Sequence, residues 1–336
     1  MNSGSTFTGR MLGHRRDAFY VYEPLWRMTL WGYYSNNTVC NTRHKSCSTS
    51  TAMIENRIKS VSGRPTENNI LSPDDIREIE SPISVPIRVL DHVINCRLRA
   101  VRTFLEPGVT EALKFAGPSW SDYWYCNQRG QPWDTCLNVL EGSCQQAQHV
   151  VAKVLRLSVG AYWTLLFRNN NLKVVHLFRD PRGVVNSRLN TRGYALKKTI
   201  ENVKTNAEAL CDKMWSDLQE GKRLMGKFPD RFKFVHYEKL VYLDKEVIEL
   251  HDFLGLRLTR ANLETIRRDY TNVLWKWREN RQNNAFWWRT SLPWELIKAV
   301  DNACGDVLEE LGYPVFENFE HMQNMNYTDI LYGLKY

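Results

Sequence analysis

The chain has 336 residues, of which 43% are hydrophobic, and its formal net charge at pH 7 is +8. This composition predicts a globular protein with a substantial core and excludes an intrinsically disordered chain. The sequence contains no apolar run of about 18 residues, so no segment of it is expected to span a membrane. A basic surface suits an anionic nucleotide, a sulfated glycan or a nucleic acid, and charge alone does not choose between them.

The first residues predict a turn that binds an anion. Gly4 lets the backbone approach a ligand closely. Hydroxyl donors come from Ser3, Ser5 and Thr6, and successive N–H groups at such a turn form a cradle for an anion. Residues 7–12 then have the pattern of a helix that starts at the turn.

A short strand follows over residues 19–22 and ends at Glu23. Three more segments are predicted as strands, over residues 150–157, 172–178 and 232–237. Longer helix-bearing segments separate all four. This alternation favours an α/β fold with a parallel sheet and helices on both of its faces, in which ligands bind beyond the carboxyl ends of the strands.

The cysteines are eight in number, which is compatible with disulfides in an oxidising compartment. Cys126, Cys136 and Cys144 lie in a stretch rich in tryptophan and glycine that we expect to be irregular, with some of the three bridged. Cys211 and Cys304 fall in helical patterns, over residues 196–225 and 301–311. They could pair with each other or remain as buried thiols.

The segment 172–191 is the most informative in the chain. After the strand, Arg179 stands at its end, Asp180 is a good N-cap and Pro181 a good first residue of a helix. Two helical turns later comes Ser187. This unit of strand, turn and helix delivers a guanidinium and a hydroxyl to one end of a sheet, where a phosphate can be held. The alternative is that Arg179 only forms a salt bridge at the strand end and that Ser187 is an ordinary helix serine.

Three further residues have two interpretations each. Arg182 either faces solvent or reaches the phosphate. Trp288 and Arg289 lie in a segment rich in tryptophan and arginine, which either packs in the core or contacts a nucleotide or sugar.

Taken together, these motifs resemble the Golgi carbohydrate 6-O-sulfotransferases. The resemblance rests on both anion-binding turns at this spacing and extends to other short segments along most of the chain, whereas residues 38–150 match only loosely. The segments that carry it are SGSTF at 3–7, EPLW at 23–26, KVLRL at 153–157, RDPRGVVNSR at 179–188 and FVHYEKL at 234–240.

The resemblance implies an α/β sulfotransferase fold that uses 3′-phosphoadenosine 5′-phosphosulfate (PAPS) as the sulfate donor. The first loop, from Asn2 through Ser3, Gly4, Ser5 and Thr6 to Phe7, is expected to bind the 5′-phosphosulfate, and Arg179 with Ser187 the 3′-phosphate. Arg182, Trp288 and Arg289 are further candidates for donor binding. The acceptor is expected to be a glycan, not a nucleic acid.

Glu23 is the candidate general base. Sulfuryl transfer is an in-line displacement, and a base should take the proton of the sugar hydroxyl as it attacks. Glu23 follows the loop by one helix and one strand, which predicts a place beside the transferred group. Its alternative role is to brace the loop before Pro24. No metal is expected, because Arg179 and the backbone dipoles can balance the anionic donor.

The sequence departs from the family in two places. Asn2 stands where the family has an arginine, and Met1 stands where a first strand should lead into the loop. We therefore expect a single sulfotransferase domain over residues 1–336, truncated at its amino terminus, with an acceptor-side insertion over residues 38–150. The full-length protein is expected to be a type II membrane protein of the Golgi lumen. A catalytically inactive nucleotide- or glycan-binding relative, and a P-loop kinase, are the alternatives.

Overall fold

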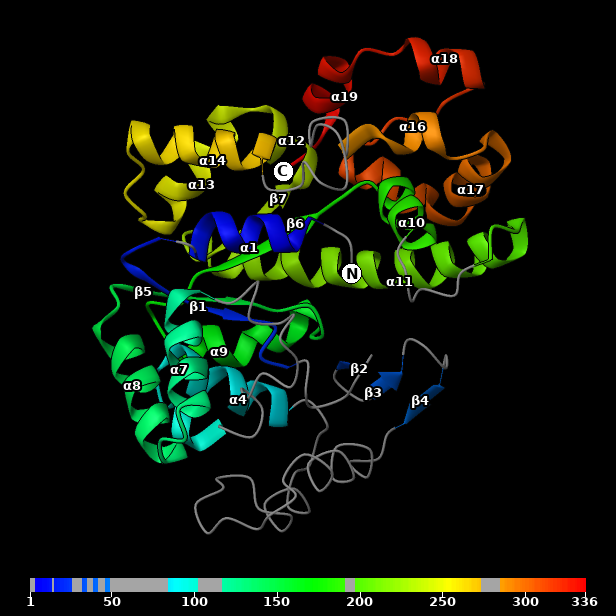
Figure 1. Ribbon diagram of the computed structural model, residues 1–336. Helices are drawn as coiled ribbons and strands as arrows, with labels where there is room; N and C mark the ends of the chain where they lie inside the picture. Colours follow the sequence, from blue (N-terminus) through cyan, green and yellow to red (C-terminus); the bar gives the residue numbers. More distant parts are fainter. Residues whose placement is uncertain are drawn as a thin grey trace. The chain divides into compact units, whose positions relative to one another are not determined.

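The computed structural model of the protein describes residues 4–13, 15–25, 32–34, 39–41, 46–48, 84–101, 117–190, 197–272 and 285–336. The chain divides into two units. We call Thr6–Asn170 the N-terminal unit, and Asn171–Tyr336 together with Met1–Ser5 the C-terminal unit. Figure 1 labels the helices and strands of both.

The N-terminal unit contains a pair of parallel strands with helices. Its first helix, α1, begins at the boundary between the units. The described elements are α1 (Ser5–Gly13), β1 (Ala18–Tyr22), β2 (Gly32–Tyr34), β3 (Val39–Asn41), β4 (Ser46–Ser48), α4 (Ser84–Ile94), η1 (Leu98–Val101), α7 (Pro118–Gln128), α8 (Trp133–Gln146), β5 (His149–Lys153), η2 (Val159–Ala161) and α9 (Tyr162–Arg168).

Strands β1 and β5 pair in parallel, from Ala18 opposite His149 to Tyr22 opposite Lys153. Helix α1 packs closely on β1 because Gly13 faces the ring of Tyr20, where a Cβ atom would overlap the ring. Parallel strands place their carboxyl ends at the same edge of a sheet. The residues that follow β1 therefore lie beside the last residue of β5.

Two local predictions for this unit differ from the structure, one in the kind of element and one only in where a strand ends. The stretch that contains Cys126, Cys136 and Cys144 is helical rather than irregular. Pro118 is the first residue of α7, Pro132 is the N-cap of α8, and Gly130, with φ +71°, lies in the turn between them. Its cysteines are bridged, Cys126 to Cys136 and Cys144 to Cys96. The strand predicted over residues 150–157 ends at Lys153.

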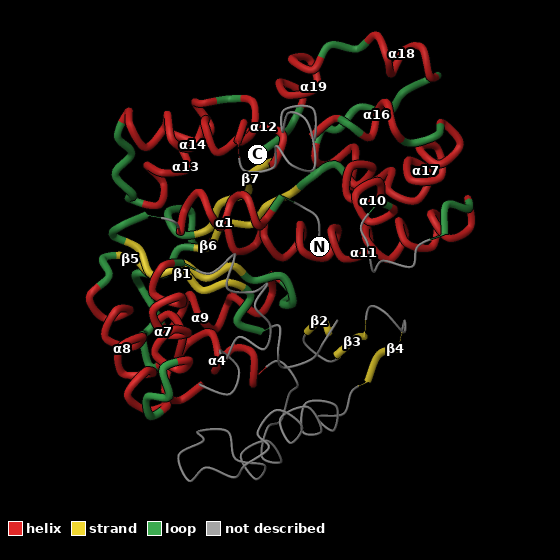
Figure 2. Tube along the Cα trace, viewed as in Figure 1, coloured by secondary structure: helices red, strands yellow, loops and turns green. Residues whose placement is uncertain are grey.

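The C-terminal unit is mostly helical, as Figure 2 shows. Its own pair of parallel strands is β6 and β7. The elements are β6 (Val174–Phe178), α10 (Pro181–Leu189), α11 (Ile200–Lys227), β7 (Phe232–His236), α12 (Tyr237–Tyr242), α13 (Asp244–Leu254), α14 (Arg260–Asn272), α16 (Trp288–Ser291), α17 (Trp294–Leu311), α18 (Phe319–Asn324) and α19 (Tyr327–Gly333).

Aromatic side chains form the core between β6, β7 and α11. Phe178, Phe232 and Phe234 are almost fully buried, and Gly221 of α11 lets that helix approach the two β7 rings. The long helix α11 packs along α17. Cys211 and Cys304 join these two helices in a disulfide, so the pairing alternative from the sequence is confirmed.

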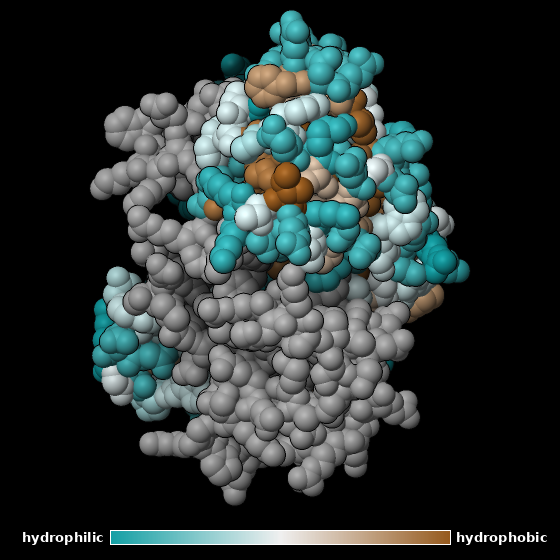
Figure 3. Space-filling model, turned by 90° about the vertical axis from the view of Figure 1, so that its right-hand side faces the viewer, coloured by the Kyte–Doolittle hydropathy of each residue, from teal (hydrophilic) through white to brown (hydrophobic). Residues whose placement is uncertain are grey.

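The predicted α/β class with parallel strands is confirmed, and the four predicted strands pair two by two, one pair in each unit. None of the helices in the described ranges has the length and apolar character needed to cross a membrane. The coloured surface in Figure 3 is mostly hydrophilic, with hydrophobic residues scattered singly among hydrophilic ones. Such scattered residues are normal on a protein surface.

Candidate active site

The turn between β6 and α10 has the local structure that its sequence predicts. Strand β6 ends at Phe178, and Asp180 caps the helix by accepting a hydrogen bond from the backbone N–H of Arg182 at 2.8 Å. Pro181 is the first helical residue. Its missing N–H costs nothing there, and its fixed φ suits the helix. Arg179 therefore stands at the carboxyl end of a parallel strand, where α/β proteins bind ligands.

Arg179 is held between an aromatic ring and a glycine. The guanidinium carbon lies 4.8 Å from the centroid of the Tyr237 ring, a cation–π distance. On α10, a Cβ atom at Gly183 would come within 3.2 Å of Nε of Arg179. Ser187 follows Gly183 by four residues on the same helix, so both lie on one helix face. The face of α10 that borders Arg179 thus also carries the predicted hydroxyl.

The first loop meets the same aromatic ring. Gly4 has φ +85°, a left-handed conformation that favours glycine, and a Cβ atom there would overlap the ring of Tyr237. Ser5 begins helix α1 directly afterwards. Gly4, Arg179 and Tyr237 all belong to the C-terminal unit. One buried ring therefore contacts both of the turns that the sequence predicts to bind anions.

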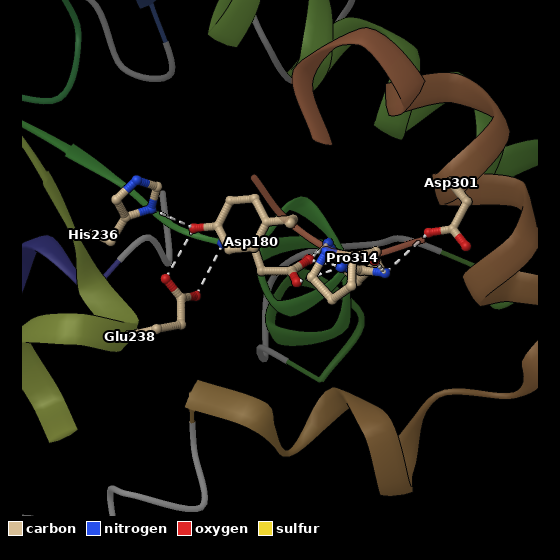
Figure 4. A network of polar contacts seen from close by, with 7 residues as sticks. Asp180, His236, Glu238, Asp301 and Pro314 are labelled. Atoms are coloured by element: carbon tan, nitrogen blue, oxygen red, sulfur yellow. Dashed lines mark hydrogen bonds and ion pairs between the residues drawn. The ribbon is translucent and has the colours of Figure 1, made fainter. Parts of the chain in front are cut away.

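Arg182 is fully buried, and protein groups occupy its guanidinium. Two of its nitrogens bond the carboxylate of Asp180 at 2.8 and 2.9 Å, and the third bonds the Pro314 carbonyl at 2.9 Å and lies 3.3 Å from Asp301. Figure 4 shows this network. The ring of Trp288 lies 4.3 Å from its guanidinium carbon. These contacts give Arg182 a structural role in shaping the turn, while donor contact by Arg182 stays a prediction.

Trp288 and Arg289 are also buried, at 1% and 3% exposure. Arg289 donates hydrogen bonds to the backbone carbonyls of Met322 and Met325, and its guanidinium carbon lies 4.8 Å from the Tyr327 ring. Both residues thus tie α16 to neighbouring segments of the C-terminal unit. Their predicted contact with a nucleotide is not tested by these interactions.

Glu23 lies at the end of β1 in the N-terminal unit, with φ +46° and 9% exposure. Its carboxylate bonds the ammonium group of Lys153 at 2.8 Å and lies 3.5 Å from the guanidinium of Arg156. The Lys153 ammonium is also 3.2 Å from the hydroxyl of Thr6, in the first turn of α1. The β1–β5 pairing produces this cluster, because Lys153 is the partner of Tyr22.

The electrostatics of the cluster keep Glu23 ionised. Burial by itself would raise the pKa of this carboxyl group, but the charges of Lys153 and Arg156 outweigh burial and lower it. Burial lowers the pKa of Lys153, and Glu23 opposes that shift. A carboxylate is the form that can accept a proton, and a cation beside Thr6 can stabilise negative charge at the first loop.

Comparison with known proteins finds one matching family model and several similar proteins. Residues 158–323 match the family described as the sulfotransferase domain. Carbohydrate sulfotransferase 1 of Danio rerio is 24% identical over 96% of this chain and 78% of its own length. Carbohydrate sulfotransferase 4 of Mus musculus is 24% identical over 96% of this chain and 82% of its own length.

The chain is thus similar to carbohydrate sulfotransferases over most of its length, and its residues 158–323 match the sulfotransferase domain. Carbohydrate sulfotransferase 1 of Homo sapiens is likewise 24% identical, over 96% of this chain and 79% of its own length. No solved structure matches the chain. In the described part of the chain, no three His, Cys, Asp or Glu side chains are grouped so that they could hold a metal ion.

Several residues of the candidate site were not predicted from the sequence. Lys153 and Arg156 pair with Glu23, while Tyr237 and Glu238 contact the Arg179 turn. A cation at the end of a strand was the available signal for Lys153. Conversely, Asn2 and Ser3 lie outside the described residues, so the structure says nothing about their predicted role.

Proposed function

We propose that this protein transfers a sulfuryl group from PAPS to a hexose hydroxyl, at the 6 position, of a glycan chain. The observation that carries the proposal is the contact of one ring, that of Tyr237, with both Gly4 and Arg179. A donor with two separate anionic groups needs two anion-binding turns, and here they share a side chain. The names of the relatives, carbohydrate sulfotransferases 1 and 4, support a carbohydrate acceptor.

In this proposal the two turns divide the donor between them. The loop from Asn2 to Phe7 binds the phosphosulfate through backbone N–H groups and hydroxyls, and Arg179 with Ser187 binds the 3′-phosphate. The donor supplies an activated sulfuryl group whose leaving group is a phosphate. The protein contributes position and charge, which is the main contribution of enzymes that transfer such groups.

Glu23 is the proposed general base, and Lys153 is the proposed electrostatic partner. The ion pair keeps Glu23 ionised and orients it, and the ammonium group of Lys153 reaches the hydroxyl of Thr6 in the loop. Lys153 supplies a cation at a loop in which Asn2 replaces the arginine of related enzymes. A cation beside Thr6 supports catalysis over an inactive, purely binding role.

The remaining assignments are proposals on the same basis. Residues 38–150 form an acceptor-side insertion within a single sulfotransferase domain, and Arg182, Trp288 and Arg289 support or extend the donor site. The proposed location of the protein is the Golgi lumen. Three disulfides among the described cysteines suit that compartment. The exposed sequon that begins at Asn326 suits a glycoprotein.

Transfer of labelled sulfate from PAPS to a panel of hexose-containing glycans tests the proposal, together with calorimetry of adenosine 3′,5′-bisphosphate. We expect transfer, and micromolar or tighter binding that needs no magnesium. Replacing Arg179 with Met should weaken the binding of the bisphosphate by about 10- to 100-fold, the range expected for the loss of a charge-assisted hydrogen bond. The same change should leave the affinity for 5′-AMP nearly constant. Arg260→Met, on the exposed face of α14, is the matched control.

Other outcomes would assign the protein differently. Binding of the bisphosphate without transfer to any glycan would favour the inactive relative, which the replacement at Asn2 makes the second candidate. A P-loop kinase would require magnesium for nucleotide binding, although the loop lacks the Gly-Lys-[Ser/Thr] ending that serves phosphate and Mg²⁺. No affinity of the folded wild-type protein for the bisphosphate would contradict the proposal.

A further inference from the structure

A chain of buried hydrogen bonds runs from the Arg179 turn to the last residues of the protein. Figure 4 shows the part of it that includes Asp180, Glu238 and His236. Glu238, in α12, is fully buried. One oxygen of its carboxyl group accepts a hydrogen bond from the backbone N–H of Asp180 at 3.0 Å, and the other lies 2.9 Å from the hydroxyl of Tyr313. That hydroxyl is 3.0 Å from Nδ1 of His236, and Nε2 of His236 is 2.7 Å from the carbonyl oxygen of Lys335.

The donors and acceptors in this chain allow two arrangements of its protons, one of which places a proton on Glu238. The Lys335 carbonyl can only accept, so Nε2 of His236 carries hydrogen. Nδ1 of a neutral His236 then accepts from the Tyr313 hydroxyl. With its proton directed to His236, the Tyr313 oxygen accepts from Glu238, which is then a neutral acid; with its proton directed to Glu238, the hydroxyl donates to that carboxyl oxygen. The alternative with the same number of protons is a carboxylate at Glu238 with a cationic His236.

Burial decides between the two arrangements. Both groups are almost completely shielded from water, at 0% exposure for Glu238 and 1% for His236. Burial lowers the pKa of His236 to about 4. Burial, with the neighbouring Asp180 carboxylate, raises the pKa of Glu238 to about 7. The neutral pair is therefore the favoured form below neutral pH.

The charges around Glu238 explain why its ionisation matters for the turn. A carboxylate at Glu238 would stand beside that of Asp180, which already pairs with Arg182, and would attract Arg179. It would then compete with a bound phosphate for that guanidinium. The titratable and charged groups that face Glu238 and its hydrogen-bond partners are Arg179, Asp180, Arg182, His236, Lys239 and Tyr313.

We propose that Glu238 is a positioning residue of the donor site, which holds the Arg179–Asp180 turn as a neutral acid and weakens phosphate binding there once it has lost its proton. The proposal rests on the proposed function, in which Arg179 binds the 3′-phosphate. If only the neutral form binds well, the affinity for adenosine 3′,5′-bisphosphate falls about tenfold between pH 6 and pH 8, in proportion to the neutral fraction.

Calorimetry with adenosine 3′,5′-bisphosphate from pH 6 to pH 8, on the intact disulfide-bonded protein, tests the proposal. In Glu238→Gln the amide reproduces the neutral acid, since its oxygen accepts from Asp180 and its NH₂ group donates to Tyr313. At pH 6 we expect the Kd of Glu238→Gln for the bisphosphate to be within about twofold of the wild-type Kd. Between pH 6 and pH 8 the wild-type Kd divided by the variant Kd should rise about tenfold. This ratio cancels the titration of the ligand phosphates.

Two further variants serve as controls, one that removes the hydrogen-bond acceptor and one on the protein surface. Glu238→Ala leaves the N–H of Asp180 without its acceptor and should weaken binding at every pH. Glu249→Gln changes an exposed glutamate of α13 and should follow wild type throughout. The proposal is wrong if Glu238→Gln weakens binding as much as Glu238→Ala at pH 6, or if it keeps the wild-type pH dependence.

Wild-type protein alone provides a second measurement should the variants fail to fold. The ratio of its affinities for the bisphosphate and for 5′-AMP isolates the 3′-phosphate. Titration of that phosphate by itself would strengthen binding as the pH rises, so a ratio that falls with pH supports Glu238 and a ratio that rises contradicts it. Absence of bisphosphate binding at every pH would instead contradict the proposed function.

Discussion

The ring of Tyr237 touches two segments that are more than 170 residues apart in the chain, at Gly4 and at Arg179. Neither contact depends on the hydroxyl group, because the Gly4 contact involves ring carbons and the Arg179 contact involves the ring face. A ring of this size fills the space that a left-handed glycine leaves beside it. Tyr237 thus has the geometry to couple the two turns energetically.

We expect Tyr237→Leu to lower the ratio of the affinity for adenosine 3′,5′-bisphosphate to the affinity for 5′-AMP by about tenfold. The reason is that Arg179 loses a cation–π contact of about 1–2 kcal/mol and is no longer held in place. Tyr237→Phe should retain the wild-type ratio. Calorimetry with both nucleotides measures it. Phe232→Leu, which removes a buried ring from β7 away from both turns, is the control for lost packing. An equal change in Tyr237→Leu and Phe232→Leu would contradict the coupling.

Two roles are possible for Glu23, namely a general base for the sugar hydroxyl or a structural support for the first loop, and they predict different effects of a substitution. Replacing Glu23 with Gln should lower kcat by about 10²–10⁴, the usual contribution of a general base, and leave the Kd of the bisphosphate nearly unchanged. Steady-state sulfate transfer and calorimetry measure the two quantities. Asp17→Asn, which removes an ion pair with Arg15 from the same unit, should keep kcat. A brace would show the reverse pattern, with weaker nucleotide binding and little change in kcat.

At the scale of elements, a covalent link joins the two long helices α11 and α17. Cys211 and Cys304 are 93 residues apart, whereas the bridge from Cys126 to Cys136 closes a separation of 10. A bridge across a longer loop removes more conformational entropy from the unfolded chain. The first bridge should therefore contribute more to stability than the second.

We expect the double variant Cys211→Ala/Cys304→Ala to lose about 2 kcal/mol more free energy of unfolding than Cys126→Ala/Cys136→Ala, by the dependence of loop entropy on length. Urea denaturation of both variants and of wild type, without reductant, measures the difference. Equal losses in the two double variants would show that strain or local packing, and not loop length, decides the contribution of each bridge.

For the molecule as a whole, Glu238 makes stability depend on pH. In the unfolded chain this glutamate has its ordinary pKa of 4.5, whereas in the folded protein its pKa is about 7. Between these values unfolding releases a proton, so this group's contribution to stability falls as the pH rises. Its slope is about −1.4 kcal/mol per pH unit within that window.

Glu238→Gln should therefore become more stable relative to wild type as the pH rises from 4.5 to 7, by up to about 3 kcal/mol in total. Taking the difference between the two proteins removes the contributions of groups that do not interact with Glu238. Urea denaturation at closely spaced pH values measures it, with Glu249→Gln as the control. A constant difference across the window would show that Glu238 is ionised in the folded protein at these pH values.

The sequence by itself determined the local units of this protein. Asp180 and Pro181 specify the start of α10 because an N-cap and a first-turn proline act within a few residues. The β-branched and aromatic run before Arg179 specifies β6 in the same way. The parallel α/β class followed from the order of such units. Helices α7 and α8 were missed because their tryptophans and glycines suggested a loop, whereas their prolines mark helix starts.

Only the tertiary structure decided which side chains meet. Glu23 pairs with Lys153 because β1 lies beside β5. Tyr237 reaches Arg179 because β6 and β7 pair in parallel, and it reaches Gly4 because the first residues of the chain pack in the C-terminal unit. The neutral state of Glu238 likewise depends on burial against Asp180 and Tyr313. Contacts between residues a hundred or more positions apart, and the desolvation that shifts a pKa, are set by packing, which no local pattern encodes.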